Sequence, residues 1–68
     1  MIITVNGNIK DFKDNLNLKE LLSHLELKSD RNGIALCVNM QVIPKEQWEQ
    51  TGLTDGDKVE IVIAAPGG

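Results

Sequence analysis

The stretch KVEIVI, Lys58 to Ile63, decides how this chain folds. Its apolar side chains alternate, which predicts a β-strand that turns Val59, Ile61 and Ile63 toward a core and leaves Val62 on the outer face. Among the predicted strands it alone has a clean one-sided pattern, and it leads directly into the last residues of the chain. The fold therefore depends on what pairs with this strand and what covers it.

The other end of the chain predicts a hairpin. Met1 to Val5 alternates and is rich in β-branched residues, as strands are. Asn6-Gly7 follows, and both residues tolerate the left-handed backbone of a type I′ turn. The return strand is expected from Asn8 to about Phe12. A two-residue turn places Phe12 on the core face, whereas a bulged three-residue turn favours Ile9, and the sequence leaves both registers open.

A helix is expected between the hairpin and the middle of the chain. Asn17 suits an N-cap, and Glu20 three positions later completes the pattern of a capping box. The helix is expected from about Leu18 to Leu27, because one stripe of leucines follows helical spacing at Leu18, Leu21, Leu22 and Leu25.

The middle of the chain predicts two more strands and a cap on the core. Ile34 to Val38 is apolar at every position, so a buried strand is expected, with Cys37 packed in the core. Val42-Ile43 begins a short return strand that Pro44 stops, since proline has no N–H for the ladder. Trp48 and Leu53 are expected to turn inward, because so short a chain needs their buried area.

Together these elements predict an α+β fold. One leucine-striped helix covers one face of a mixed sheet of four to five strands. If the strand at 58–63 pairs parallel to the first strand at the sheet centre, right-handed crossover and short connections give a β-grasp, or ubiquitin-like, roll. The expected domain is residues 1–63, followed by a flexible C-terminal tail at residues 64–68.

Composition argues against several classes of function. The net charge is −3 and the seven basic residues are spread along the chain, so nucleic-acid binding is not expected. No apolar run approaches the roughly 20 residues that span a bilayer, and the first residues lack the features of a signal peptide. A single cysteine cannot form an internal disulfide, which fits a reducing, cytoplasmic location.

Side chains able to do chemistry are sparse. His24 lies at the border of the leucine stripe without a catalytic partner nearby in the sequence, so a surface residue is expected. Asp55 and Asp57 flank Gly56, and turn formation explains them. One histidine and one cysteine cannot form a zinc site within the chain. We therefore expect no catalytic residue, no metal site and no bound cofactor.

The last five residues carry the clearest functional signal. Gly67-Gly68 makes an unhindered extended ribbon, because glycine has no Cβ, and Ala64, Ala65 and Pro66 space it from the body. Such a ribbon suits a narrow channel in a partner enzyme, with the carboxylate of Gly68 as the reacting group.

Two apolar side chains are not required by the predicted fold. Met40 stands at a predicted turn tip, and Val62 lies on the outer face of the last strand. Scattered exposed apolar residues are normal, but these two form a candidate partner surface.

Several motifs occur together in one known family. They are Ile3-Thr4-Val5-Asn6-Gly7, Leu18-Lys19-Glu20-Leu21-Leu22, Ala35-Leu36-Cys37-Val38-Asn39, Val42 to Trp48, Leu53 with Asp55-Gly56-Asp57, and the final Gly67-Gly68. Over nearly its whole length the chain resembles the sulfur carrier proteins of thiamine thiazole biosynthesis, the ThiS family. The run from Asn39 through Pro44 to Trp48, with Asp-Gly-Asp and the diglycine end, is the specific part. Met40 departs from the glycine often found there, and Pro66 stiffens the tail.

The resemblance implies a protein substrate rather than an enzyme. An E1-like adenylyltransferase (ThiF-like) would use ATP to adenylate the Gly68 carboxylate, and ATP would belong to that partner. A cysteine-desulfurase-type donor would then supply sulfur, giving a C-terminal thiocarboxylate. The thiocarboxylate would donate its sulfur to a thiazole synthase (ThiG-like).

Three other readings stay open. The small subunit of molybdopterin synthase shares the fold and the diglycine end, although it is usually longer before its central strand. A ubiquitin-like protein modifier would end as an isopeptide on lysine. A plain β-grasp interaction domain would carry an idle tail, and deleting Gly68 would leave its partner binding intact.

Overall fold

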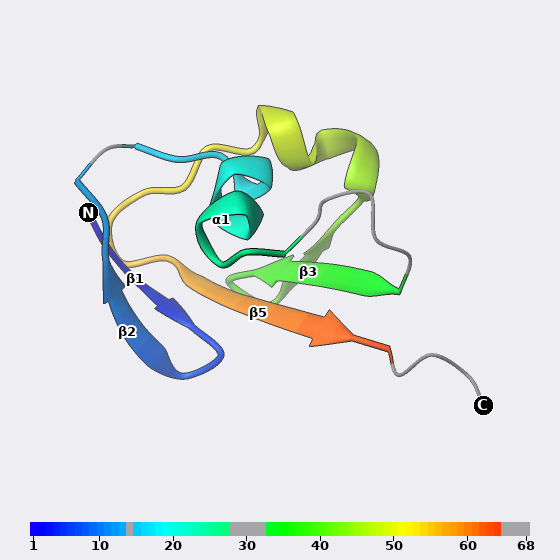
Figure 1. Cartoon of the computed structure of the whole chain (residues 1–68), viewed down its shortest axis with the longest axis horizontal. Helices are drawn as coiled ribbons and strands as arrows, with labels where there is room; N and C mark the ends of the chain where they lie inside the picture. The colour runs from blue at the N-terminus through cyan, green and yellow to red at the C-terminus, as the bar shows by residue number, and fades with distance from the viewer. Residues whose placement is uncertain (14, 28–32, 65–68) are drawn as a thin grey trace.

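The computed structural model describes residues 1–13, 15–27 and 33–64. Figure 1 shows one sheet with the helices on one side of it. The elements in chain order are β1 (Ile2–Val5), β2 (Asn8–Asp11), α1 (Leu18–His24), β3 (Ile34–Val38), β4 (Gln41–Ile43), the 3₁₀ helix η1 (Lys45–Gln50) and β5 (Lys58–Ile63). The five-stranded sheet has the order β2-β1-β5-β3-β4.

The central strand is β5, as the sequence predicts. It runs parallel to β1, with Val5 opposite Val59, and antiparallel to β3, with Leu36 opposite Ile61. Val59 and Ile61 are buried, but Ile63 is 40% exposed, so its predicted burial is wrong. A seven-residue helix is about 10 Å long and a six-residue strand about 20 Å, so α1 is too short to cover all of β5.

The first hairpin settles the register that the sequence leaves open. Asn6 and Gly7 have φ of +50° and +82°, as a type I′ turn requires, and Val5 pairs directly with Asn8. Phe12 therefore packs against the core, and Ile9 is 78% exposed on the other face. The two-residue turn is the correct alternative.

Helix α1 begins as predicted and ends early. The Asn17 side chain accepts the Glu20 N–H at 2.8 Å and the Glu20 carboxylate accepts the Asn17 N–H at 3.0 Å, which completes the capping box. At the other end, Glu26 adopts φ of +61°, and the N–H of Leu27 reaches the carbonyl of Leu22 at 2.8 Å. This left-handed cap ends the helix at His24, so the predicted extension to Leu27 is wrong.

The core lies between α1, η1 and the inner face of the sheet. It contains Ile3, Val5, Leu16, Leu18, Leu21, Leu22, Leu36, Trp48, Leu53, Val59 and Ile61. Trp48 is buried as predicted, and its indole N–H donates to the Ile43 carbonyl at 2.8 Å. Cys37 was expected in this core, but it is half-buried and absent from it. In β3 it alternates with the buried Leu36, so it belongs to the other face of the sheet.

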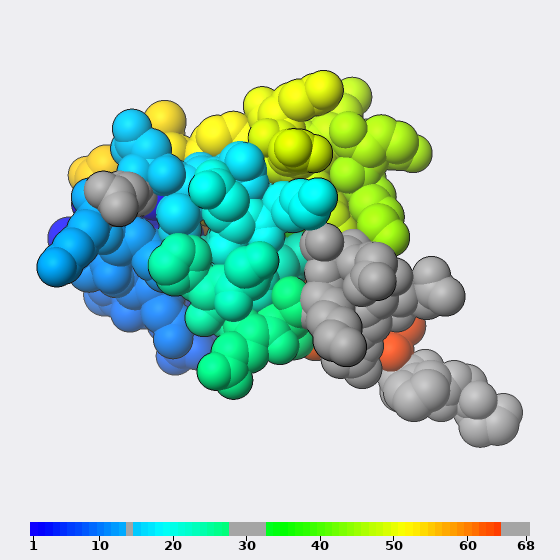
Figure 2. Space-filling model, turned by 45° about the horizontal axis from the view of Figure 1, so that its top comes forward, coloured from blue at the N-terminus to red at the C-terminus, as the bar shows by residue number. Residues whose placement is uncertain are grey.

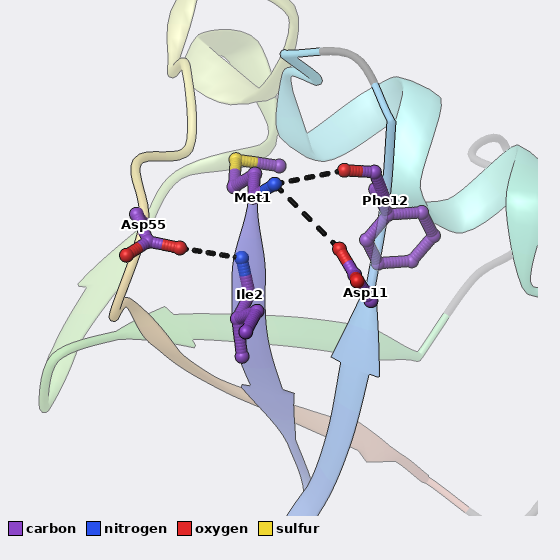
Figure 3. A network of polar contacts seen from close by, with 5 residues as sticks. All are labelled: Met1, Ile2, Asp11, Phe12 and Asp55. Carbon is purple, nitrogen blue, oxygen red and sulfur yellow. Dashed lines mark hydrogen bonds and ion pairs between the residues drawn. The ribbon is translucent and has the colours of Figure 1, made fainter.

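Polar contacts hold β1 on both of its sides (Figure 3). The Met1 amino group donates to the Phe12 carbonyl at 2.9 Å and lies 3.6 Å from a carboxylate oxygen of Asp11. On the other side, the Ile2 N–H donates to the Asp55 carboxylate at 2.6 Å. The turn at Asp55 is thereby tied to the start of the strand that pairs with β5.

The whole arrangement is the predicted α+β roll. A hairpin, a covering helix and an antiparallel pair surround a final central strand, with β1 and β5 parallel. This topology is the β-grasp, and it carries the end of β5 to one side of the molecule, next to the start of β3 (Figure 1).

Candidate functional site: the end of β5 and the open face of the sheet

The end of β5 is fixed to β3. Ile63 pairs with Ile34, and the Ala64 N–H donates to the Gly33 carbonyl at 2.8 Å. Gly33 has φ of +88°, and a Cβ built there would lie 3.3 Å from the Cβ of Ala64. Glycine suits this position because of its backbone angle, and a Cβ here would also be in tight contact with Ala64. Of the predicted tail, Ala64 is described, and residues 65–68, with the predicted reacting Gly68, lie outside the described part.

A second contact holds β5 on its other side. The side-chain oxygen of Asn6 accepts the Ile61 N–H at 2.7 Å, and its side-chain nitrogen donates to the Ile61 carbonyl at 3.1 Å. The sequence identifies Asn6 only as a turn residue. Its second role joins positions 55 residues apart, so no local pattern predicts it.

The start of β5 has a similar contact from the second hairpin. The side-chain oxygen of Asn39 accepts the Lys58 N–H at 3.0 Å, and its side-chain nitrogen donates to Asp57 at 3.0 Å. Asn39 and Met40 have φ of +50° and +70°, and Val38 pairs with Gln41 across this two-residue turn. Both hairpin asparagines therefore bind β5, one near each end.

The Asp57 carboxylate makes hydrogen bonds at the turn that precedes β5. One carboxylate oxygen accepts the Thr54 N–H at 2.8 Å and the other accepts the Asn39 amide. Partial burial acts to raise the pKa of Asp57, but these hydrogen bonds favour the charged form more strongly and lower its pKa below the ordinary 3.8. The contact of Asp57 with Thr54 agrees with the turn role predicted for it, whereas the Asp55 carboxylate binds the Ile2 N–H outside the turn, a contact that the sequence did not predict.

The sheet has one face that α1 and η1 cover and one face open to solvent. Figure 2 shows the covered side, where α1, in cyan, and η1, in yellow-green, form much of the surface. On the open face, Ala35 pairs with Val62 and Cys37 with Val42. Met40 follows at the turn between β3 and β4.

These residues form what we call the apolar strip: Val62, Ala35, Cys37, Val42 and Met40. Met40 is 93% exposed, Val42 is 68% exposed and Val62 is 57% exposed. The strip includes both residues of the predicted partner surface, Met40 and Val62, and adds Val42, which sequence reasoning missed. Strand register places Val42 beside Cys37 on one side, and the charged Glu60 beside Cys37 on the other.

His24, which was expected to be a surface residue, lies apart from the apolar strip. It is exposed, and its ring meets that of Phe12 edge-on, with centroids 5.4 Å apart. Both line an open depression of about 240 Å³ together with Asp11, Lys13 and Leu16. Within residues 1–13, 15–27 and 33–64, no cluster of three or more metal-binding side chains occurs. No helix in the same ranges is long and apolar enough to cross a membrane.

Comparison with known proteins relates this geometry to one family. The model of the ThiS family matches residues 3–68. The chain is 39% identical over 49 residues to the sulfur carrier protein ThiS of Escherichia coli, which is 72% of this chain and 71% of that protein. The crystal structure of the thiamine biosynthesis protein ThiS from Geobacter metallireducens has a TM-score of 0.83 with this fold at 33% identity, over 100% of both chains.

A larger protein contains a similar segment. All 68 residues of this chain match part of a thiazole synthase from Paramagnetospirillum magneticum at 34% identity. The chain spans only 20% of the length of that protein.

Proposed function

The chain belongs to the ThiS family, and from that premise we propose that it is a sulfur carrier of thiamine biosynthesis whose Gly68 carboxylate is the reacting group. The family match over residues 3–68 carries this proposal, because it includes the diglycine end. The fold supports it, since the strand before that end lies at the centre of the sheet and is held on both sides.

The proposed reaction first activates the Gly68 carboxylate, because a free carboxylate reacts poorly with nucleophiles. The Gly68 carboxylate attacks the α-phosphorus of ATP in the partner enzyme, pyrophosphate leaves, and a mixed anhydride forms. The terminal sulfur of a cysteine persulfide then attacks the carbonyl carbon and AMP leaves. A thiol cleaves the resulting S–S bond, leaving a thiocarboxylate on Gly68. The partner supplies the groups that stabilise the developing charges, so the carrier needs only an accessible end.

The tail residues allow the Gly68 carboxylate to reach the active site of the partner enzyme. Ala64 leaves the sheet beside Gly33, and Ala65 and Pro66 lead on to the diglycine. Gly67 and Gly68 carry no side chain that would block a narrow channel. We expect Gly68→Ala to slow adenylation, and an unchanged adenylation rate would argue against a narrow channel.

We assign the apolar strip to docking of the E1-like adenylyltransferase. The turn between β3 and β4 requires the left-handed backbone of Met40, but folding of the monomer does not explain a methionine side chain that is almost fully exposed there. Methionine adapts its shape to different surfaces, which suits a carrier that must meet more than one enzyme. The second partner is a thiazole synthase, as the match to part of such an enzyme suggests.

Reconstitution tests the function. The chain is combined with an E1-like adenylyltransferase, ATP, a cysteine desulfurase with cysteine, and thiazole synthase with its other substrates, and thiazole is measured. We expect product with the full chain and none with the chain lacking Gly68. Thiazole from the shortened chain would contradict the proposal, and sulfur delivered to a molybdopterin precursor in place of thiazole would move the chain to the other carrier family. A lysine-linked conjugate would indicate a protein modifier.

A further inference from the structure

The last residues of β5 are paired unequally on their two sides. Toward β3, pairing continues through Val62 and Ile63 to the hydrogen bond between Ala64 and Gly33. Toward β1, the ladder stops at Val59, whose carbonyl accepts the Asn6 N–H at 3.0 Å. Beyond Val59, within the described residues, the side chain of Asn6 supplies the hydrogen bonds on that side.

The Asn6 amide replaces a strand residue at this point. Its oxygen and nitrogen bind the N–H and the carbonyl of the same residue, Ile61, as a paired backbone would. The type I′ turn fixes the backbone of Asn6, so the amide is already aimed at β5. The contact is part-buried, where water competes poorly for the bonds.

From this geometry we propose that Asn6 is a positioning residue for sulfur transfer: its side chain fixes the end of β5, and so the direction in which the chain leaves the sheet toward the reacting carboxylate. This inference rests on the proposed carrier function. Because the Asn6 side chain already holds the end of β5 in the free carrier, the enzyme does not have to order that end when the carrier binds. Loss of Asn6 should therefore weaken binding of the carrier rather than slow the chemical step.

Asn39 provides a matched control. It occupies the same position in the second type I′ turn with the same φ of +50°, and its amide also contacts β5, but at Lys58, the end remote from Ala64. Glycine at either position keeps the left-handed backbone and removes the amide. Asn6→Gly and Asn39→Gly therefore each remove one amide from β5, the first at Ile61 and the second at Lys58, where the Asn39 amide also binds Asp57.

The first measurement is amide hydrogen exchange by NMR in the full chain. The exchange rate of the Ile61 amide in Asn6→Gly is expected to rise about tenfold relative to that of the Leu36 amide. Removing the Asn6 side chain takes away the acceptor of the Ile61 N–H, so local opening at Ile61 costs less free energy. In Asn39→Gly this ratio stays unchanged. Asn6→Asp, which keeps the acceptor for the Ile61 N–H but loses the donor, is expected to fall between Asn6→Gly and the natural chain.

The second measurement is the steady-state rate of adenylation at increasing carrier concentration. For Asn6→Gly we expect KM to rise about three- to tenfold with kcat within about twofold of the natural value, since the loss lies in binding. Asn39→Gly should keep both constants. Equal KM changes in the two variants, or unchanged Ile61 exchange in Asn6→Gly, would overturn the proposal. If the natural chain itself is never adenylated, the proposed function fails, while the exchange data still decide whether the Asn6 contact holds β5.

Discussion

At the scale of single residues, Glu26 and Met40 adopt the left-handed backbone without being glycine or asparagine, with φ of +61° and +70°. An ordinary side chain in this region costs about 1 kcal/mol. Glu26 sits where helices commonly place glycine, and its conformation closes the end of α1. The turn between β3 and β4 requires the left-handed backbone of Met40, but its exposed side chain has no structural role, and we assign that side chain to partner binding.

The two residues therefore make a paired prediction. Met40→Gly and Glu26→Gly should each raise the free energy of unfolding by roughly 0.5–1 kcal/mol, measured by urea denaturation, because both relieve the same strain. Only Met40→Gly should also weaken binding of the adenylyltransferase, by about 1 kcal/mol or more in a titration. Equal affinity of both variants for the enzyme would remove Met40 from the docking surface.

Asp57 makes a pH prediction. Its pKa is lowered in the folded protein, so its stabilisation is fully present above the ordinary value of 3.8 and is lost as the pH falls through the lower folded pKa. In Asp57→Asn this contribution should be missing at pH 6, and the melting temperature should fall less steeply below about pH 4. Glu60→Gln, which removes an exposed carboxylate from β5, is the control. An acid limb in Asp57→Asn as steep as that of the natural chain would contradict the assignment.

At the scale of elements, α1 depends on its cap more than a longer helix would. It has seven residues, and isolated helices of that length are unstable. Asn17→Ala should lower the free energy of unfolding by about 1 kcal/mol in urea, because it removes the acceptor for the Glu20 N–H. Glu20→Gln keeps a side-chain acceptor and should change the value by less than about 0.5 kcal/mol. Equal losses in both variants would show that charge, rather than the capping box, stabilises this end.

The elements also show how far local sequence predicts structure. The capping box at Asn17, the Asn6-Gly7 turn and the alternation of β5 were predictable because each is set by neighbouring residues. The early end of α1 was not, since glutamate is a good helix former and its left-handed conformation follows from the fold. The exposure of Ile63 depends on how far along β5 the short helix α1 reaches, and the outward position of Cys37 depends on which face of the sheet α1 covers; a strand pattern alone reveals neither.

At the scale of the whole molecule, the end of the chain follows the central strand of the sheet. β5 has a strand on each side, and the two turn asparagines add contacts near its ends. The sequence predicted this central strand, and it predicted Met40 and Val62 as a partner surface. It did not predict the Asn6 contact or the place of Val42 in the apolar strip, because both depend on residues that only the completed sheet brings together.

The proposed function requires that the Gly68 carboxylate becomes a thiocarboxylate. The direct test is intact mass spectrometry of the chain after incubation with adenylyltransferase, ATP, a cysteine desulfurase and cysteine, followed by fragmentation to locate the change. We predict a mass gain equal to one oxygen replaced by one sulfur, confined to Gly68 and absent when ATP is omitted. An unchanged mass with active enzymes, or a gain of one whole sulfur atom located at Cys37 as a persulfide with Gly68 unchanged, would contradict the proposed function.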